Sequence, residues 1–319
     1  MPEKKLADRL REAIRLRGYS LRTEKAYVAW YERYVRFHHL RHPATMGLAE
    51  VEQFLTHLAS EAQVAASTQN QALAALQFLY QEVLRLPLGD LAALHARKTT
   101  YVQPYLSHAD CLRILDQLAG SSYLVAALLY GSGLRILEAL RLRVKALDFE
   151  NQLITVHDTK SNRDRLTFLP DDDQFLARLH AHLAQVRRLY DANPAIPVSL
   201  PPALSRKYQG ADRRWEWQYV FPSRDLAVDP RTLTVKRHHL HASGLQRAIT
   251  VAVRATGLTT RVTAHTLRAA FAHRLKEAGC QLDDIQKLMG HADIRTTQHY
   301  LAGQPPAHIR LHGPLSRQL

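Results

Sequence analysis

Three stripes of apolar and aromatic side chains at helical spacing constrain the first ninety residues of this chain. Residues three or four apart lie on one face of an α-helix, so each stripe predicts a helix that buries one side. Such helices are stabilised by packing on one another, and we therefore expect residues 1–94 to form a small helical domain. The stripes comprise Tyr27, Trp30, Tyr31, Tyr34 and His38, then Leu48, Val51, Leu55 and Leu58, and then Leu73, Leu76, Tyr80 and Val83.

The segment 95–105 shows no periodicity and is predicted to be an interdomain linker. Its adjacent cations, Arg97 and Lys98, are suited to contact a phosphate backbone. The remainder, residues 106–319, is expected to form a second domain that ends in a tail at 304–319.

Most of this second part has helical periodicity, but two short runs favour strands. Residues 153–156 and 166–169 are predicted to pair through a polar turn at 159–164. The stretch at about 192–222 begins rich in proline and small residues and is interpreted as an insertion. The expected fold class is therefore mainly α with a small β-sheet.

The charge of the chain points to a polyanionic partner. Its formal net charge is +14, and residues 201–261 alone hold eleven Lys or Arg against four acids. Nucleic acid is the commonest partner of such basic proteins.

The two cysteines, Cys111 and Cys280, have no metal-ligand spacing, which suits a reducing compartment. The first residues show no apolar signal segment, and the longest apolar run, Tyr123 to Tyr130, is too short to cross a bilayer. We therefore expect a soluble, cytoplasmic protein with no membrane partner.

Three charged residues in the middle of the chain are candidates for phosphate chemistry. Arg135 and Glu138 are three apart and share a helical face, a spacing that is equally typical of a surface ion pair. Lys160 lies in the predicted hairpin turn, where an exposed lysine is also ordinary.

Four further candidates lie in the last third of the chain. His265 and Arg268 share a face after Thr263, a possible helix cap, and this arrangement also suits a capped helix with a solvated arginine. His291 follows Gly290 and could simply cap a helix end, and Tyr300 could be a packing residue. Together, however, an arginine fork, imidazoles and a phenol supply what is needed to attack a phosphodiester with a tyrosine.

This ordered set resembles the tyrosine recombinases, whose boxes read roughly TGLR-x-x-E, a hairpin lysine, H-x-LRH and LGH followed by TT-x-x-Y. The corresponding segments here are Gly133-Leu134-Arg135, His265-Thr266-Leu267-Arg268, Gly290-His291 and Thr296-Thr297-Gln298-His299-Tyr300. The resemblance covers nearly the whole chain. It implies an N-terminal helical core-binding (SAM-like) domain that clamps DNA and a C-terminal tyrosine-recombinase catalytic domain.

The resemblance also implies a mechanism. Tyr300 would attack the scissile phosphate to give a 3′-phosphotyrosine and a free 5′-hydroxyl. Arg135 and Arg268 would neutralise the phosphate, with Glu138 supporting Arg135. Lys160 would protonate the leaving oxygen, while His265 and His291 would hydrogen-bond the phosphate and His265 would help to deprotonate Tyr300. No cofactor or metal is needed, because the intermediate conserves the bond energy.

Within the family, several segments are similar to the integron integrases. They are Ala203 to Tyr208, Trp217 to Ser223, Lys236 to His239 and Leu245 to Ala248, together with His42-Pro43-x-x-Met46-Gly47. Integron integrases act on a folded single strand of a cassette site, marked by extrahelical bases, and on a duplex primary site. Members of the family assemble as four protomers on two DNA sites and exchange C-terminal helices. In this chain the tail would be the exchanged segment.

The insertion and the basic segment after it are therefore expected to bind DNA. Flipped bases stack on aromatic rings while cations follow the backbone. Trp217 could instead be a core residue, and the run His238 to His241 could be read as a metal site, although no cysteine or carboxylate clusters with it. The expected DNA contacts are Lys207, Tyr208, Trp217, Pro230, Lys236, Arg237, His238 and His239, with Arg97 and Lys98.

Two departures from the family pattern bear on activity. Ala269 stands where the family has a second histidine, and Leu301-Ala302 replaces the usual residues after the tyrosine. Ala269 is expected to leave a cavity or an unpaired polar group beside Arg268, at a cost of about 1–3 kcal/mol. Two alternatives stay open: a duplex-specific recombinase of the Xer or phage type, and a catalytically weakened DNA-binding relic.

Overall fold

The computed structural model describes residues 5–89, 94–96, 104–157, 164–229 and 233–302. The chain divides into two compact units, Met1–Tyr101 and Val102–Leu319. Among the described residues, no helix is both long and apolar enough to cross a membrane. The expectations for Arg97, Lys98, Lys160, Pro230 and the tail at 304–319 lie outside the described residues.

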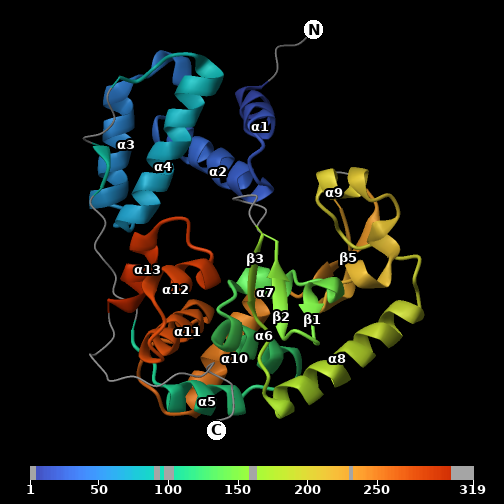
Figure 1. The fold of residues 1–319 in the computed structure, drawn as a ribbon. Helices are drawn as coiled ribbons and strands as arrows, with labels where there is room; N and C mark the ends of the chain where they lie inside the picture. Colours follow the sequence, from blue (N-terminus) through green and yellow to red (C-terminus); the bar gives the residue numbers. More distant parts are fainter. Residues whose placement is uncertain (1–4, 90–93, 97–103, 158–163, 230–232, 303–319) are drawn as a thin grey trace. The chain divides into compact units, whose positions relative to one another are not determined.

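The N-terminal unit is helical (Figure 1). The predicted stripes line its core except at Leu48, which is exposed because it begins its helix at the surface. Ser20 caps the second helix by accepting a hydrogen bond from the Thr23 amide. The buried Tyr34 and Tyr80 hydroxyls lie 3.0 Å apart, which joins helices distant in sequence. The elements are α1 (Leu6–Leu16), α2 (Leu21–Phe37), α3 (Leu48–Ser60), α4 (Ala66–Phe78) and the π-helical turn η2 (Leu79–Leu84), with a 3-10 turn η1 (Pro43–Thr45).

The C-terminal unit is built around α6 (Gly120–Ser132), in which every residue from Tyr123 to Ser132 is buried. It is longer than the apolar run of the sequence suggests, because Gly131 and Ser132 continue the helix and Gly133 ends it with a φ of +63°. A Cβ at Gly133 would lie 2.3 Å from the Phe271 ring, so glycine is required there. The helices around α6 are α5 (His108–Asp116), α7 (Ile136–Leu140), α8 (Asp173–Asp191), α10 (Ala242–Ala255) and α11 (Ala264–Glu277).

The predicted hairpin belongs to an antiparallel sheet of three strands in the order β1 (Leu147–Asp148), β2 (Leu153–Val156) and β3 (Arg165–Phe168). In the third strand, apolar side chains face outward and polar side chains face inward. Leu166 and Phe168 are exposed, whereas Thr167 is buried and donates to the Ser132 carbonyl. Arg165 shares the inward face with Thr167, and this places a guanidinium inside the domain.

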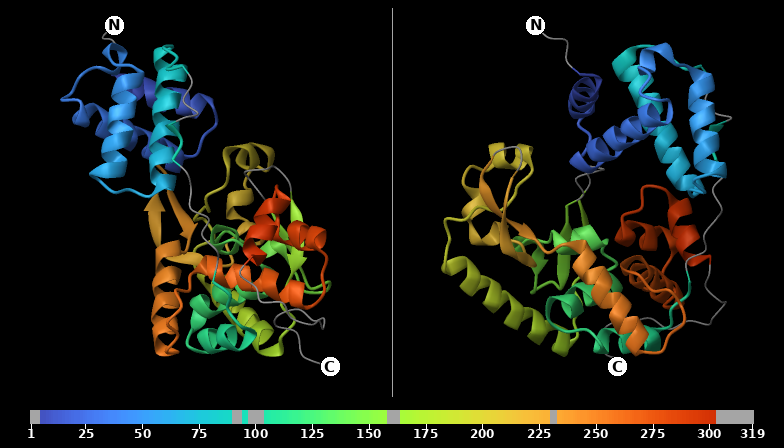
Figure 2. Two further views of the ribbon diagram at one scale, coloured as in Figure 1. Left: turned by 90° about the vertical axis from the view of Figure 1, so that its left-hand side faces the viewer. Right: turned by 180° about the vertical axis from the view of Figure 1, so that it is seen from behind.

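A second sheet was not predicted. Strands β4 (Pro222–Val228) and β5 (Val235–His239) form an antiparallel ribbon, and Figure 2 shows β5 leading into α10. Most residues of β4 are exposed on both faces, so the sequence carries no alternation that would reveal the strand.

The stretch at 192–222 contains one short helix, α9 (Pro202–Lys207), and two 3-10 turns, η5 (Ala211–Arg213) and η6 (Trp215–Trp217). Arg143 fixes this stretch to the rest of the unit. Its guanidinium donates to the carbonyls of Trp217 and Ser199 at 2.8 and 2.6 Å. The stretch is therefore an ordered layer of the unit.

The last described helices, α12 (Leu282–Met289) and α13 (Ile294–Leu301), form a small core of their own with α11. Thr263 caps α11, as predicted, by accepting from the Thr266 amide. Gly290 ends α12 with a φ of +63°, and a Cβ there would lie 2.8 Å from the Arg165 side chain. The turn at Gly290 therefore leaves no room for a side chain beside Arg165.

Candidate active site

Six of the seven predicted catalytic residues are described, and they form one cluster. Arg135 is the N-cap residue of α7, two residues after Gly133, and its Nη2 donates to the Gly290 carbonyl at 2.8 Å. His265 and Arg268 come from α11, His291 from the turn after α12, and Tyr300 from α13. Glu138 lies at the centre of the cationic part. The seventh, Lys160, is outside the described residues.

Glu138 binds two arginines at once. One carboxylate oxygen accepts from Arg135 Nη1 at 2.6 Å, and the pair Arg165 Nη1 and Nη2 binds both oxygens at 3.0 and 2.7 Å. Burial by itself would raise the pKa of the Glu138 carboxyl, but the hydrogen bonds and charges of Arg165 and Arg135 bring it down to about 2. Glu138 is therefore ionised at neutral pH, and the surface ion pair considered as an alternative is instead a half-buried network.

Arg165 is the residue of this network that the sequence did not reveal. Its side chain is only 10% exposed, and its Nε donates to the Leu288 carbonyl at 3.0 Å. Arg165 thereby connects β3 to the end of α12. It also binds the Glu138 carboxylate, which in turn binds Arg135. The only sequence signal was a cation beside the apolar run of β3, which is equally typical of a strand that starts in solvent.

Arg268 is almost fully buried, with 1% of its surface exposed. Its guanidinium donates to the carbonyls of Gly133 and Met289, so it joins the ends of α6 and α12. Burial and the neighbouring charge of Arg135 lower the pKa of Arg268 to about 10, which leaves it charged at neutral pH. Its Nε has no hydrogen-bond partner among the described residues. This is an unpaired polar group of the kind expected beside Ala269.

The hydrogen bonds of His291 fix its tautomer. Arg268 can only donate, so the Nε2 atom of His291, 3.1 Å from Arg268 Nη2, is an acceptor. The proton of the neutral ring is then on Nδ1, which lies 2.9 Å from the Thr297 hydroxyl. Burial and the charges of Arg268, Arg135 and Arg165 lower the pKa of His291 to about 3.

This depressed pKa predicts acid-sensitive stability. The unfolded chain binds a proton at His291 near pH 6.5, whereas the folded protein does so only near pH 3. Stability therefore falls as pH decreases below about 6.5, by roughly 1.4 kcal/mol per pH unit from this group. We expect His291→Gln to flatten the dependence of the free energy of unfolding by that amount between pH 6.5 and 4.5, measured by urea denaturation. An unchanged slope would contradict the assigned neutral state.

The phenolic hydroxyl of Tyr300 is within hydrogen-bond distance of His265. Its oxygen lies 2.8 Å from Nε2 of His265, and the rings are 4.9 Å apart at their centroids. Partial desolvation and the charges of Arg268 and Arg135 lower the pKa of His265. The imidazole is therefore neutral at pH 7 and can accept the phenolic proton, while Tyr300 also packs against His291.

Comparison with known proteins places this cluster in a family. A family model described as the phage integrase family matches residues 104–305, and one described as an N-terminal SAM-like domain of phage integrases matches residues 6–90. An integrase/recombinase of Escherichia coli is 43% identical over 300 residues, covering 93% of this chain and 88% of the relative. The chain belongs to the phage integrase family.

Two further similarities agree with this assignment. A tyrosine recombinase XerD of Agrobacterium fabrum is 29% identical, covering 84% of this chain and 81% of the relative. A lambda integrase dimer bound to a core site has the same fold, with a TM-score of 0.63 over 96% of this chain and 98% of that chain at 15% identity. The predicted fold class is confirmed, and the protein is a tyrosine-type site-specific DNA recombinase.

The described residues that were predicted to bind DNA fall into two groups. In the first, Trp217 is buried, and Lys145 Nζ lies 3.1 Å from the centroid of its ring. The ring centroids of Tyr208 and Trp217 are 5.3 Å apart. Tyr208 is 41% exposed, and Lys207 beside it is exposed as well. Tyr208 and Lys207 are thus accessible, whereas Trp217 is covered by a lysine that the sequence did not single out.

The second group lies on β5, and its two cations are already engaged. Lys236 pairs with Asp229 at 2.8 Å, and Arg237 Nη1 donates to the Ser223 carbonyl at 3.0 Å. Both His238 and His239 are partly buried, and burial lowers the pKa of His239. Among the described residues no group of three or more His, Cys, Asp or Glu is arranged to hold a metal, so the metal reading of this run has no support in them.

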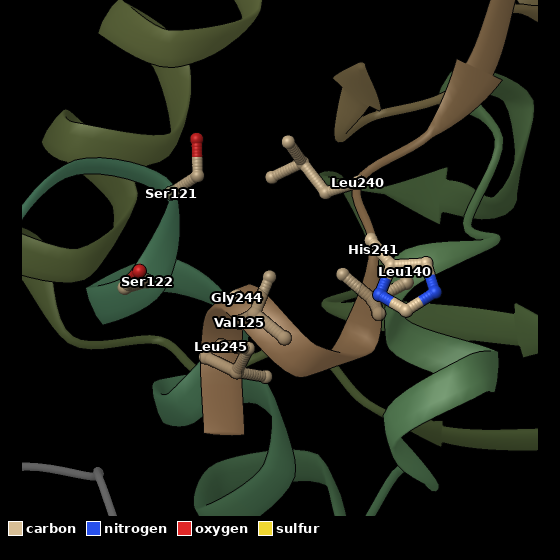
Figure 3. Close-up of a pocket in the computed structure, with 8 residues that line it drawn as sticks. All are labelled: Ser121, Ser122, Val125, Leu140, Leu240, His241, Gly244 and Leu245. Carbon is tan, nitrogen blue, oxygen red and sulfur yellow. The ribbon is translucent and has the colours of Figure 1, made fainter. Parts of the chain in front are cut away.

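A cavity of about 230 Å³ lies between the beginnings of α6 and α10 (Figure 3). Leu140, Leu240 and Leu245 line it together with the Ser121 side chain. None of the residues in the tyrosine cluster lines this cavity, so the cavity is not part of the candidate active site.

Proposed function

We propose that this recombinase is an integron integrase. It cuts and rejoins DNA through a 3′-phosphotyrosine at Tyr300, acting on folded single-stranded cassette sites and on a duplex primary site to integrate and excise gene cassettes. The observation that carries the proposal is the layer at 192–222, which Arg143 locks to the catalytic core and which presents Tyr208 beside Trp217 and Lys145.

The catalytic cluster supports the following chemistry. The Tyr300 oxygen bonds to phosphorus as the 5′-oxygen leaves, and the phenolic proton passes to the neutral His265, 2.8 Å away. Arg135, whose side chain is 41% exposed, is the guanidinium that a phosphate reaches first. We assign the proton delivered to the 5′-oxygen to Lys160, as the family resemblance implies.

Arg268 and His291 act from inside the cluster in this proposal. Buried Arg268 contributes positive charge in a desolvated setting, where charge stabilises a developing phosphorane strongly. The neutral His291 accepts from Arg268 and so orients it. Glu138 keeps Arg135 in place and balances the surrounding cations.

The aromatic layer supports recognition of unpaired bases. An exposed ring next to cations can stack a flipped base while lysines contact the backbone, and each such stack contributes about 1–3 kcal/mol. Tyr208 and Lys207 are positioned for this without rearrangement. A base that reached Trp217 would have to displace the Lys145 ammonium from its ring.

We assign to β5 and the linker a role in contacting the DNA backbone. His238, His239, Lys236 and Arg237 with Pro230 would flank the bound strand, and Arg97 and Lys98 would follow the duplex between the core-binding domain at 1–94 and the catalytic domain at 106–319. DNA-bound relatives with this fold include XerH on a palindromic difH substrate and the lambda integrase dimer on its core site. Four protomers on two sites, exchanging the tails at 304–319, complete the proposed assembly, which would work in the cytoplasm.

The test is a comparison of substrates in a covalent adduct assay. The purified protein is mixed with a nicked, folded bottom-strand cassette hairpin carrying extrahelical bases, or with the same sequence as a linear duplex. We expect a denaturation-resistant adduct at least about tenfold more abundant on the hairpin.

Tyr208→Ala should reduce the hairpin adduct by about 5- to 150-fold, as loss of one stacked base predicts, and leave any duplex adduct unchanged. Phe149→Leu, which alters an aromatic residue that is also exposed, is the matched control and should have no effect. Equal adducts on both substrates would instead favour a duplex-specific recombinase of the Xer or phage type, and binding without an adduct would favour a DNA-binding relic.

A further inference from the structure

A second histidine on α11 contacts Tyr300, at the opposite end of that residue from its hydroxyl. His273 is buried, with 1% of its surface exposed, and its Nε2 lies 2.7 Å from the Tyr300 backbone carbonyl. The sequence analysis assigned no role to this position. Neither the proposed chemistry nor any DNA contact uses it.

The carbonyl that His273 binds is one that a helix cannot satisfy by itself. Helix α13 ends at Leu301, and the last four carbonyls of an α-helix lack intrahelical donors. A carbonyl oxygen can only accept, so Nε2 of His273 must carry the proton. Burial lowers the pKa of His273, in keeping with a neutral ring that donates one hydrogen bond.

The ring of His273 is held in this orientation from the side. Tyr105 packs against it with ring centroids 5.4 Å apart and planes at 31°. The Tyr105 hydroxyl is itself fixed, because it donates to Glu277 on α11 at 2.7 Å. The donor to Tyr300 is therefore presented by a rigid element.

Helix α11 thus attaches to Tyr300 at two points. His265, near the start of the helix, meets the phenolic oxygen, and His273, eight residues later and about 12 Å further along the axis, meets the backbone carbonyl. The first contact must break when the phenol loses its proton and turns to phosphorus. The second contact does not involve the reacting atoms and can persist through the reaction.

We propose that His273 is a positioning residue that anchors the Tyr300 backbone on α11, so that the phenol keeps its reach to the phosphate once its bond to His265 is lost. The proposal rests on the proposed role of Tyr300 as the nucleophile. A small displacement of a reacting group costs up to about 100-fold in rate, so loss of the anchor should slow cleavage without weakening DNA binding.

Two amide substitutions separate the hydrogen bond from the packing. In His273→Gln the amide nitrogen is able to reach the position of Nε2 and can donate to the same carbonyl. In His273→Asn the side chain is one methylene shorter and cannot reach it. Leu275→Ala is the stability control, because Leu275 is buried in the same small core but makes no bond to Tyr300.

The first readout needs no DNA. Full-length protein carrying 3-fluorotyrosine at position 300 is examined by fluorine NMR. We expect the parent, His273→Gln and Leu275→Ala to give one common resonance, and His273→Asn to give a shifted or broadened one. The second readout is the single-turnover rate of adduct formation on the hairpin or duplex, expected to fall by about 10- to 100-fold for His273→Asn, with recovery to within about threefold in His273→Gln and DNA affinity within about twofold throughout.

Identical fluorine spectra for the two amide variants would overturn the proposal. A rate loss in His273→Asn no larger than that in a Leu275→Ala protein of equal melting temperature would also overturn it, since this would reduce His273 to a packing residue. Failure of the proposed nucleophile is a separate result, because it would appear as an adduct that survives without the Tyr300 hydroxyl and would leave the fluorine spectra as they are.

Discussion

Replacing Tyr300 with phenylalanine is expected to abolish the covalent protein–DNA adduct, by at least about 10⁴-fold in the rate of its formation. The substitution removes the only atom of this residue that can attack phosphorus and keeps the ring that packs beside His265 and His291. The fold should lose no more than the hydrogen bond to His265, about 0.5–1.5 kcal/mol. Adduct formation is followed by denaturing gel electrophoresis, with DNA affinity and the melting temperature measured on the same samples.

Tyr190→Phe provides the matched control. Its hydroxyl also makes one hydrogen bond, donating to the Arg213 carbonyl at 3.0 Å, but it lies on α8 away from the cluster. This variant should form the adduct at the rate of the parent protein. An adduct that persisted in Tyr300→Phe would mean that another side chain is the nucleophile, and the proposed mechanism would have to be abandoned.

Local sequence rules predicted much of the fold because they depend on near neighbours. The stripes from Tyr27 to Val83 lie on helices, and Thr263 caps α11 as its position suggests. The candidate catalytic residues were found from their type and order, and the described ones lie together. The boundaries at 94 and 106 stay predictions, although the chain divides into compact units between Tyr101 and Val102.

The features that sequence reasoning missed depend on long-range contacts. Arg143 and Arg165 are surrounded by carbonyls or carboxylates from segments 27 to 123 residues away. Nothing in their neighbouring residues distinguishes them from solvated arginines. The β4–β5 ribbon was not predicted for a different reason. A strand exposed on both faces has no alternation of apolar and polar residues.

The burial of Trp217 illustrates the same limit. The aromatic and basic composition of its segment indicates a surface that binds bases, yet the ring is 7% exposed and lies under Lys145. Composition predicts which side chains gather in a region, but the order in which they cover one another is set by packing. Accessible Tyr208 is therefore the better first test of base recognition.

Neutralising Glu138 is expected to have the largest effect on stability. Glu138→Gln leaves the guanidiniums of Arg135, Arg165 and Arg268 around a site that has lost the carboxylate they share. Removing one partner of a buried ion pair typically destabilises by about 3–5 kcal/mol. We expect a loss of this order at pH 7, measured as the free energy of unfolding in urea, and a cleavage rate reduced about 100-fold because Arg135 is no longer held.

The pH dependence provides an independent check on Glu138. Its folded pKa of about 2 lies below the ordinary value of 4.5, so its contribution is complete above about pH 4.5 and is lost as pH falls toward 2. The shift corresponds to roughly 3 kcal/mol, and the parent protein should lose this stability across that window, whereas Glu138→Gln should not. Glu150→Gln, at an exposed carboxylate, should behave like the parent. If Glu138→Gln unfolded at the same urea concentration as the parent at pH 7, the carboxylate would not be what holds the arginines together. Arg268 would then be fixed by the Gly133 and Met289 carbonyls and by His291.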